Sequence, residues 1–183
     1  REQGIQLVLA VGGGSAIDTA KAIANGACYD GDVWDLFDGK GKNTEVLPLG
    51  TVVTIPAAGS EMSDSCVITR EEDLCKRGRN TPLNFPKFSI LNPEFTYTLP
   101  PFQTACGAVD AISHVVEPFF FSDEATYGNI DLHDHMQIGV IRAMYENLPK
   151  VLAHPDDVQL RGMMQFAATV GLNGWLTCGV QGW

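Results

Sequence analysis

The sequence has little positive charge. Its 183 residues include 12 Lys and Arg against 22 Asp and Glu, which gives a formal net charge of −10. The longest basic run is the short segment Lys76–Arg79. Nucleic acids and anionic membrane surfaces are negatively charged and bind to basic surfaces. The composition therefore predicts no nucleic-acid partner and no membrane partner.

Paired cysteines and long hydrophobic runs are also absent from the sequence. The five cysteines are odd in number and widely spaced, without a Cys-x-x-Cys pair: Cys28, Cys66, Cys75, Cys106 and Cys178. This pattern is typical of a reducing cytosol and argues against a disulfide scaffold or a structural zinc site. No apolar run approaches the roughly 18 residues that a membrane helix needs. We therefore expect a soluble, cytoplasmic protein.

What is present is an ordinary globular composition, with 45% hydrophobic and 19% charged residues. A chain of this length can bury a real core. It has no initiator Met, and Arg1–Gly4 leads within a few residues into a strand-like run. We therefore expect an internal piece of a longer chain.

The first segment predicts half of a βαβ unit. Leu7–Val11 is a continuous apolar run, which is typical of a parallel strand covered on both faces. Gly12–Ser15 then forms a glycine turn, and the apolar residues that follow recur at helical spacing. Asn25 and Gly26 provide a helix stop.

The rest of the chain divides near Pro100–Pro101. Three strand candidates precede this point: Val46–Ile55, Val67–Thr69 and Phe88–Leu91. The charged stretch Arg70–Asn80 is predicted to be a hairpin or a solvent loop. Three helices are expected after Pro100–Pro101: 103–117, 127–147 and 156–176. The sequence thus predicts an α/β domain over 1–100 and an all-α domain over 101–183.

Two motifs could carry chemistry. In the glycine turn, backbone N–H groups could approach a pyrophosphate at the positive end of the helix dipole, or the turn could simply need glycine conformations. On the helix after Pro101, Asp110 and His114 are four residues apart and share a face. They suit two ligands of a divalent metal, or an Asp–His pair at the surface. The helix is largely apolar, so a buried Asp and His there would need partners.

Other polar clusters are weaker candidates. Asp131–His135 is interpreted as a solvated helix start, and His154 as a cap or loop residue. Ser60 is expected in a turn with no obvious base in the sequence, so nucleophilic catalysis is not supported. Cys106 is assigned to the core.

Three motifs in order resemble the iron-dependent (group III) alcohol dehydrogenases: Gly12–Lys21, Thr54–Glu61 and Gly107–Glu117. The resemblance is greatest to the branch of NADPH-dependent butanol dehydrogenases and broad-range aldehyde reductases. It covers essentially the whole chain, including Tyr97–Pro101 and Gly171–Gly174.

The resemblance implies a Rossmann-like dinucleotide-binding part followed by an all-α metal-binding domain, in a dehydroquinate synthase-like architecture truncated at both ends. Gly13, Gly14 and Ser15 would hold the cofactor pyrophosphate, with Asp18 near the nicotinamide side. Thr54 would be a cofactor contact, and Lys76, after the next hairpin, would lie along the nucleotide. Ser63 and Thr98 would be further cofactor-lining positions. Asp110 and His114 would be two of the four metal ligands.

Two positions depart from the family pattern. Ala58 stands where the family usually has Thr, and Asn92 where it usually has Asp. The resemblance places the other two metal ligands, both histidines, beyond Trp183. It places the first βαβ unit, which separates NAD from NADP, before Arg1.

The implied activity is hydride transfer between NADP (or NAD) and small alcohols or aldehydes, with Fe2+ (or Zn2+ or Mn2+) as a Lewis acid. The rivals are a metal-dependent polyol dehydrogenase, a dehydroquinate-synthase-like lyase, or a non-catalytic nucleotide-binding module. The resemblance also implies a homodimer or larger homo-oligomer. The chain alone is expected to be inactive.

Overall fold

The structure is a computed structural model that describes residues 3–121, 126 and 128–176. The chain forms two compact units. The first consists of Arg1–Val53 and Ser60–Ile90, and the second of Thr54–Gly59 and Leu91–Trp183. The segment Thr54–Gly59 therefore leaves the first unit and packs with the second.

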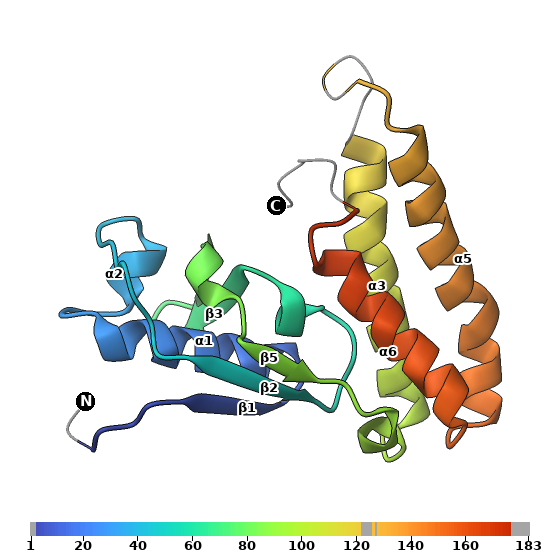
Figure 1. The fold of residues 1–183 in the computed structure, drawn as a ribbon, viewed down its shortest axis with the longest axis horizontal. Coiled ribbons are helices and arrows are strands. Elements are labelled where there is room, and N and C mark those ends of the chain that lie inside the picture. The colour runs from blue at the N-terminus through green and yellow to red at the C-terminus, as the bar shows by residue number, and fades with distance from the viewer. Residues whose placement is uncertain (1–2, 122–125, 127, 177–183) are drawn as a thin grey trace. The chain divides into compact units, whose positions relative to one another are not determined.

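The first unit contains a parallel three-stranded sheet in the order β1-β2-β5 (Figure 1). Its strands are β1 (Val8–Gly12), β2 (Leu49–Val53) and β5 (Phe88–Ile90). Helix α1 (Gly14–Cys28) follows β1 and packs against the sheet, burying Ala10, Ile17 and Val53 in one cluster. The predicted order of strand, glycine turn and helix is confirmed.

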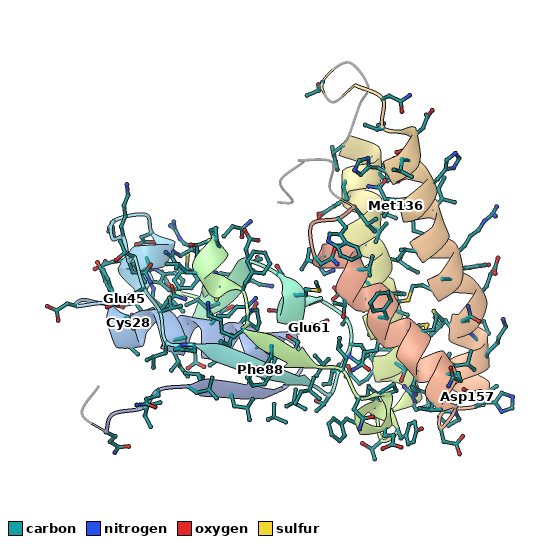
Figure 2. The ribbon with its side chains drawn as sticks, viewed as in Figure 1. Cys28, Glu45, Glu61, Phe88, Met136 and Asp157 are labelled. Atoms are coloured by element: carbon teal, nitrogen blue, oxygen red, sulfur yellow. The ribbon has the colours of Figure 1, made fainter. Side chains whose placement is uncertain are left out.

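The prediction that β1 is covered on both faces is wrong for the described residues. Ala10 is buried beneath α1, whereas Leu9 and Val11 are 52% and 59% exposed. β1 is an edge strand, and alternate side chains point to opposite faces. On β5, the ring of Phe88, labelled in Figure 2, occupies the space that a side chain at Gly50 would need.

The charged stretch after Thr69 is half of a hairpin. Strand β3 (Ser65–Arg70) pairs antiparallel with β4 (Cys75–Asn80). Beside this hairpin, the short helix α2 (Trp34–Phe37) buries three of its four residues in a cluster with Cys66. Two short 3-10 helices complete the unit, η1 (Ser60–Met62) and η2 (Pro82–Asn84).

The second unit is helical, as predicted, with α3, α5 and α6 packed side by side (Figure 1). The 3-10 helix η3 (Pro93–Thr96) precedes them. The three helices have these bounds: α3 Pro101–Phe121, α5 Asp131–Ala153 and α6 Val158–Leu172. Helix α5 continues past its predicted end and includes Pro149.

Local capping explains two helix ends. Asp157, labelled in Figure 2, caps α6 because its Oδ1 accepts hydrogen bonds from the backbone N–H groups of Gln159 and Leu160. His154 is the C-cap of α5, as expected.

Small side chains let the three helices approach closely. Ala108 and Ala111 on α3 are buried with Ala168 on α6 in the core of this unit. Met144 and Val151 supply the facing side chains of α5. In the described part of the chain, none of the helices has both the length and the apolar character that crossing a membrane requires.

Candidate functional site

The glycine turn connects β1 to α1 without any side-chain cap. Gly13 is the N-cap residue, and no acidic side chain lies in the first helical turn. The first N–H groups of α1 therefore lack a side-chain acceptor, and the positive end of the helix dipole is not neutralised there. Gly13, Gly14 and Ser15 could hold an anion at this point.

One glycine of the turn is required by its backbone as well as by packing, since Gly12 has a φ of +157°, which residues with side chains rarely adopt. A Cβ atom at Gly12 would lie 2.7 Å from the Cβ of Ala16. Of the two interpretations of the turn, the need for a glycine conformation is confirmed at Gly12, whereas Gly13 and Gly14 lie at the uncapped helix start.

Asp18 joins α1 to two other elements of the first unit. Its Oδ1 accepts a hydrogen bond of 2.6 Å from the Ser60 hydroxyl. Its Oδ2 accepts one of 3.0 Å from the Val67 backbone N–H. Both carboxylate oxygens are therefore engaged within the protein.

Lys21 is a functional candidate that the sequence analysis missed. It is 1% exposed, and its ammonium lies 2.7–2.9 Å from four oxygens: Ser60 O, Ser60 Oγ, Ser63 O and Ser65 O. Burial lowers the pKa of Lys21, and the negative charge of Asp18 opposes that shift. The sequence did contain a signal for a buried lysine, because Lys21 follows Ile17 by four residues and so lies on the apolar face of α1.

The environment of Ser60 differs from the prediction. The sequence offered no base near it, whereas the structure places Asp18 and Lys21 within hydrogen-bonding distance of its hydroxyl. Ser60 is only 5% exposed, so this hydroxyl holds the network together and is closed to a substrate. The interpretation that it is not a nucleophile still stands.

The remaining residues assigned to the cofactor lie in different settings. Ser63 is buried, and its hydroxyl accepts a hydrogen bond from the Ser65 N–H. Lys76 is exposed within β4, so it lies inside the hairpin and not after it as expected. Thr54 directly follows β2 and is half-buried, and Thr98 is exposed between η3 and α3. Lys21 donates hydrogen bonds to the Ser63 carbonyl and to the Ser60 hydroxyl, which in turn donates to Asp18. Among the described residues, no hydrogen bond joins Lys76 or Thr98 to the other residues assigned to the cofactor.

Asp110 and His114 lie one turn apart on α3 in the second unit. Asp110 is exposed, which corrects the expectation that both are buried, because this helix carries polar residues on the face away from its core. The Nδ1 atom of His114 is buried and has no hydrogen-bond partner within the described residues. A carboxylate and an imidazole with a buried, unpartnered nitrogen fit two ligands of a divalent metal.

No other described residues complete a metal site. Within residues 3–121, 126 and 128–176, no group of three or more His, Cys, Asp and Glu side chains could hold a metal ion. Asp131–His135 forms the first turn of α5, as interpreted. Cys106 is exposed, so its assignment to the core is wrong. Cys178 lies outside the described residues.

Family models match both parts of the chain. The model of the iron-containing alcohol dehydrogenases matches residues 1–93. The model of the C-terminal domain of the Fe-containing alcohol dehydrogenase family matches residues 104–177.

Individual proteins agree with these models. A probable NADH-dependent butanol dehydrogenase 1 of Bacillus subtilis is 44% identical over 100% of this chain and 46% of its own length. The NADPH-dependent aldehyde reductase YqhD of Escherichia coli is 37% identical over 100% of this chain and 47% of its length. The crystal structure of NADH-dependent butanol dehydrogenase A from Thermotoga maritima superposes with a TM-score of 0.91 at 39% identity, covering 97% of this chain and 44% of that one.

The chain thus spans about half the length of the curated relatives that it matches. Both family models are of iron-containing alcohol dehydrogenases, and the first covers more than half of the sequence. The fold of a parallel α/β sheet followed by helices is also the fold of the matched crystal structure. The chain therefore belongs to the iron-containing alcohol dehydrogenase family.

Proposed function

We propose that the intact protein transfers a hydride reversibly between NAD(P)H and small aldehydes or alcohols, with a divalent metal in its active site. The pair of Asp110 and His114 on α3 is the observation that carries this proposal. The pair presents a carboxylate and an imidazole on one helix face, and a buried nitrogen of His114 has no partner among the described residues. The relatives named butanol dehydrogenase and aldehyde reductase supply the substrate class.

Each of the two domains predicted from the sequence has a separate task in this proposal. The α/β part, residues 1–100, binds the dinucleotide, and the helical part, residues 101–183, binds the metal. The uncapped N–H groups at Gly13, Gly14 and Ser15 hold the pyrophosphate at the positive end of α1. The other residues proposed to line the cofactor are Asp18, Thr54, Ser63, Lys76 and Thr98.

The network around Lys21 has a supporting role. Lys21 donates hydrogen bonds to the backbone carbonyls of Ser63 and Ser65, and Asp18 accepts one from the Val67 backbone N–H. These bonds order the residues beside α1 before the cofactor binds, so less conformational entropy is lost on binding. Asp18 thereby acts near the nicotinamide by fixing its neighbours.

Asp110 and His114 would hold the metal, which we propose to be Fe2+, with Zn2+ or Mn2+ as the alternatives. A bound divalent ion supplies a Lewis acid that stabilises negative charge on the substrate oxygen. We also propose that the protein is cytoplasmic and forms a homodimer or a larger homo-oligomer.

The test uses the intact, metal-loaded protein with butanal and NADH or NADPH. The double variant Asp110→Ala/His114→Ala should lose bound metal and about a thousandfold in kcat/KM, because the metal contributes several kcal/mol to the barrier. EDTA treatment of the unaltered protein should have the same effect.

A second Asp–His pair provides a matched control. Asp131 and His135 have the same spacing on α5, so Asp131→Ala/His135→Ala removes the same groups elsewhere. This variant should keep both metal and activity. Activity that survives both EDTA and the Asp110/His114 change would show that the metal role is wrong, and analysis of the product would show whether the reaction is an aldehyde reduction.

A further inference from the structure

The segment Thr54–Gly59 approaches α3 with no room for a side chain between them. Gly107 on α3 is buried, and a Cβ atom there would lie 2.5 Å from the carbonyl oxygen of Pro56. It would also lie 3.4 Å from the Cβ of Ala57. Because the nearest atom belongs to the backbone, it could not rotate away as a flexible side chain could.

The other end of this segment makes a similar contact with α6. Gly59 has a φ of +65°, in the left-handed region that favours glycine. A Cβ atom at Gly59 would lie 2.9 Å from the Cβ of Leu172 and 3.0 Å from the carbonyl oxygen of Ala168. Two helices of the second unit therefore hold the segment between them, each through a glycine.

Helical geometry places Gly107 on the same side of α3 as the metal pair. At about 100° per residue, Asp110 lies within about 60° of the direction of Gly107, and His114 within about 20°. The corresponding rises along the axis are about 4.5 Å and about 10.5 Å. The segment that begins with Thr54 thus lies on the face of α3 that carries Asp110 and His114.

We propose that Gly107 is a positioning residue for hydride transfer. It sets the separation between the segment Thr54–Gly59, which contributes to the cofactor site, and the metal pair on α3. This inference rests on the proposed function. An alanine at position 107 would force Pro56 and its neighbours back by about 1 Å, and a misplacement of about 1 Å can reduce the rate about a hundredfold.

The test compares two glycines of the second unit. Gly107→Ala should reduce kcat about a hundredfold in the intact protein, while the metal content stays unchanged. With 4-deuterated NAD(P)H, the isotope effect on kcat should increase, because a misaligned hydride transfer becomes rate-limiting. A variant that is merely less stable would have a lower yield but an unchanged isotope effect.

Gly139→Ala is the matched control. Gly139 also lies in a helix, α5, but nothing lies within 4 Å of the Cβ position there. Both substitutions add the same methyl group to a helix, but only the one at the buried Gly107 meets Pro56 and Ala57. Gly139→Ala should keep the kcat and the isotope effect of the unaltered protein.

The outcomes are separable. If the unaltered protein does not oxidise NAD(P)H with an aldehyde, the proposed function fails. If it is active and Gly107→Ala keeps its kcat within about threefold with an unchanged isotope effect, only the positioning role fails. If Gly107→Ala does not fold, the same measurements are made on Ala57→Val, because a larger side chain at position 57 crowds the same contact from the side of the segment Thr54–Gly59. An unchanged isotope effect in that variant would overturn the inference.

Discussion

Each unit contains a buried side-chain nitrogen, and the two nitrogens differ in their hydrogen bonding. In the first, the ammonium of Lys21 is almost completely buried and meets four oxygen acceptors, and both oxygens of Asp18 accept hydrogen bonds. In the second, His114 has a buried Nδ1 without a partner among the described residues. A buried polar group without a partner costs free energy, and a ligand can recover that cost.

This difference separates structural groups from groups available to a ligand. Lys21 and Asp18 complete their hydrogen bonds within the protein and serve to order it. Asp110 and His114 have oxygen and nitrogen atoms that no described residue engages in a hydrogen bond. A metal ligand requires such atoms with free lone pairs. Four predictions test this distinction, from the largest expected effect to the smallest.

Replacing Lys21 should have the largest effect. Lys21→Met should lower the free energy of unfolding by about 3–5 kcal/mol, because it leaves the Ser60 hydroxyl and three backbone carbonyls without their donor and removes the positive charge beside Asp18. Urea unfolding of the intact protein measures this value. Lys87→Met is the control, since Lys87 is exposed in the same unit and its loss should change stability by no more than about 0.5 kcal/mol. Equal effects of the two changes would mean that the network is not structural.

Two cysteines should differ in their rate of alkylation, with the buried Cys66 reacting far more slowly than the exposed Cys106. Burial raises the pKa of the Cys66 thiol to about 12, whereas Cys106 is exposed one turn before Asp110. Alkylation requires the thiolate, so Cys66 should stay unmodified at pH 8 while Cys106 reacts. Peptide mass spectrometry after treatment with iodoacetamide measures both, and in denaturant both should react. Fast modification of native Cys66 would contradict the closed interior of the first unit.

A smaller effect is expected at the start of α6. Asp157→Ala should lower the free energy of unfolding by about 1 kcal/mol, because two backbone N–H groups lose their acceptor. The neighbouring Asp156→Ala keeps this cap and serves as the control in the same unfolding experiment. If both variants are equally stable, the cap contributes nothing to the helical unit.

The smallest change is expected at His114 in metal-free protein. His114→Leu should alter the free energy of unfolding by no more than about 0.5 kcal/mol, because Nδ1 loses no hydrogen bond that the described residues provide. In metal-loaded protein the same substitution should remove the stabilisation that the ion confers. Thermal unfolding with and without metal compares the two states. A large loss in the metal-free protein would make His114 a structural residue like Lys21.

Local patterns predicted most of the elements. Apolar residues at helical spacing after Gly14 correctly indicated α1, and Pro100–Pro101 marked the start of α3, although the helical unit itself begins at Leu91 and includes Thr54–Gly59. The spacing of Asp110 and His114 placed them on one face of a helix, because that relation depends only on helix geometry. These features need no knowledge of which segments meet.

The burial of individual side chains was harder to predict. Cys106 and Asp110 are exposed although their helix is largely apolar, because only one of its faces meets α5 and α6. Lys21 was overlooked because its partners, Ser60, Ser63 and Ser65, lie far along the sequence. Such contacts depend on the path of the chain, which a local period does not contain.

The sequence by itself determined the chemistry that is present: a glycine turn before a helix, and a carboxylate and an imidazole one helical turn apart. Its ordered motifs were also sufficient to indicate the family. Only the tertiary structure decided which polar groups have partners, and that Pro56 approaches Gly107 too closely for a side chain. Helical spacing follows from local backbone geometry, whereas contacts between distant segments form only when the whole chain packs.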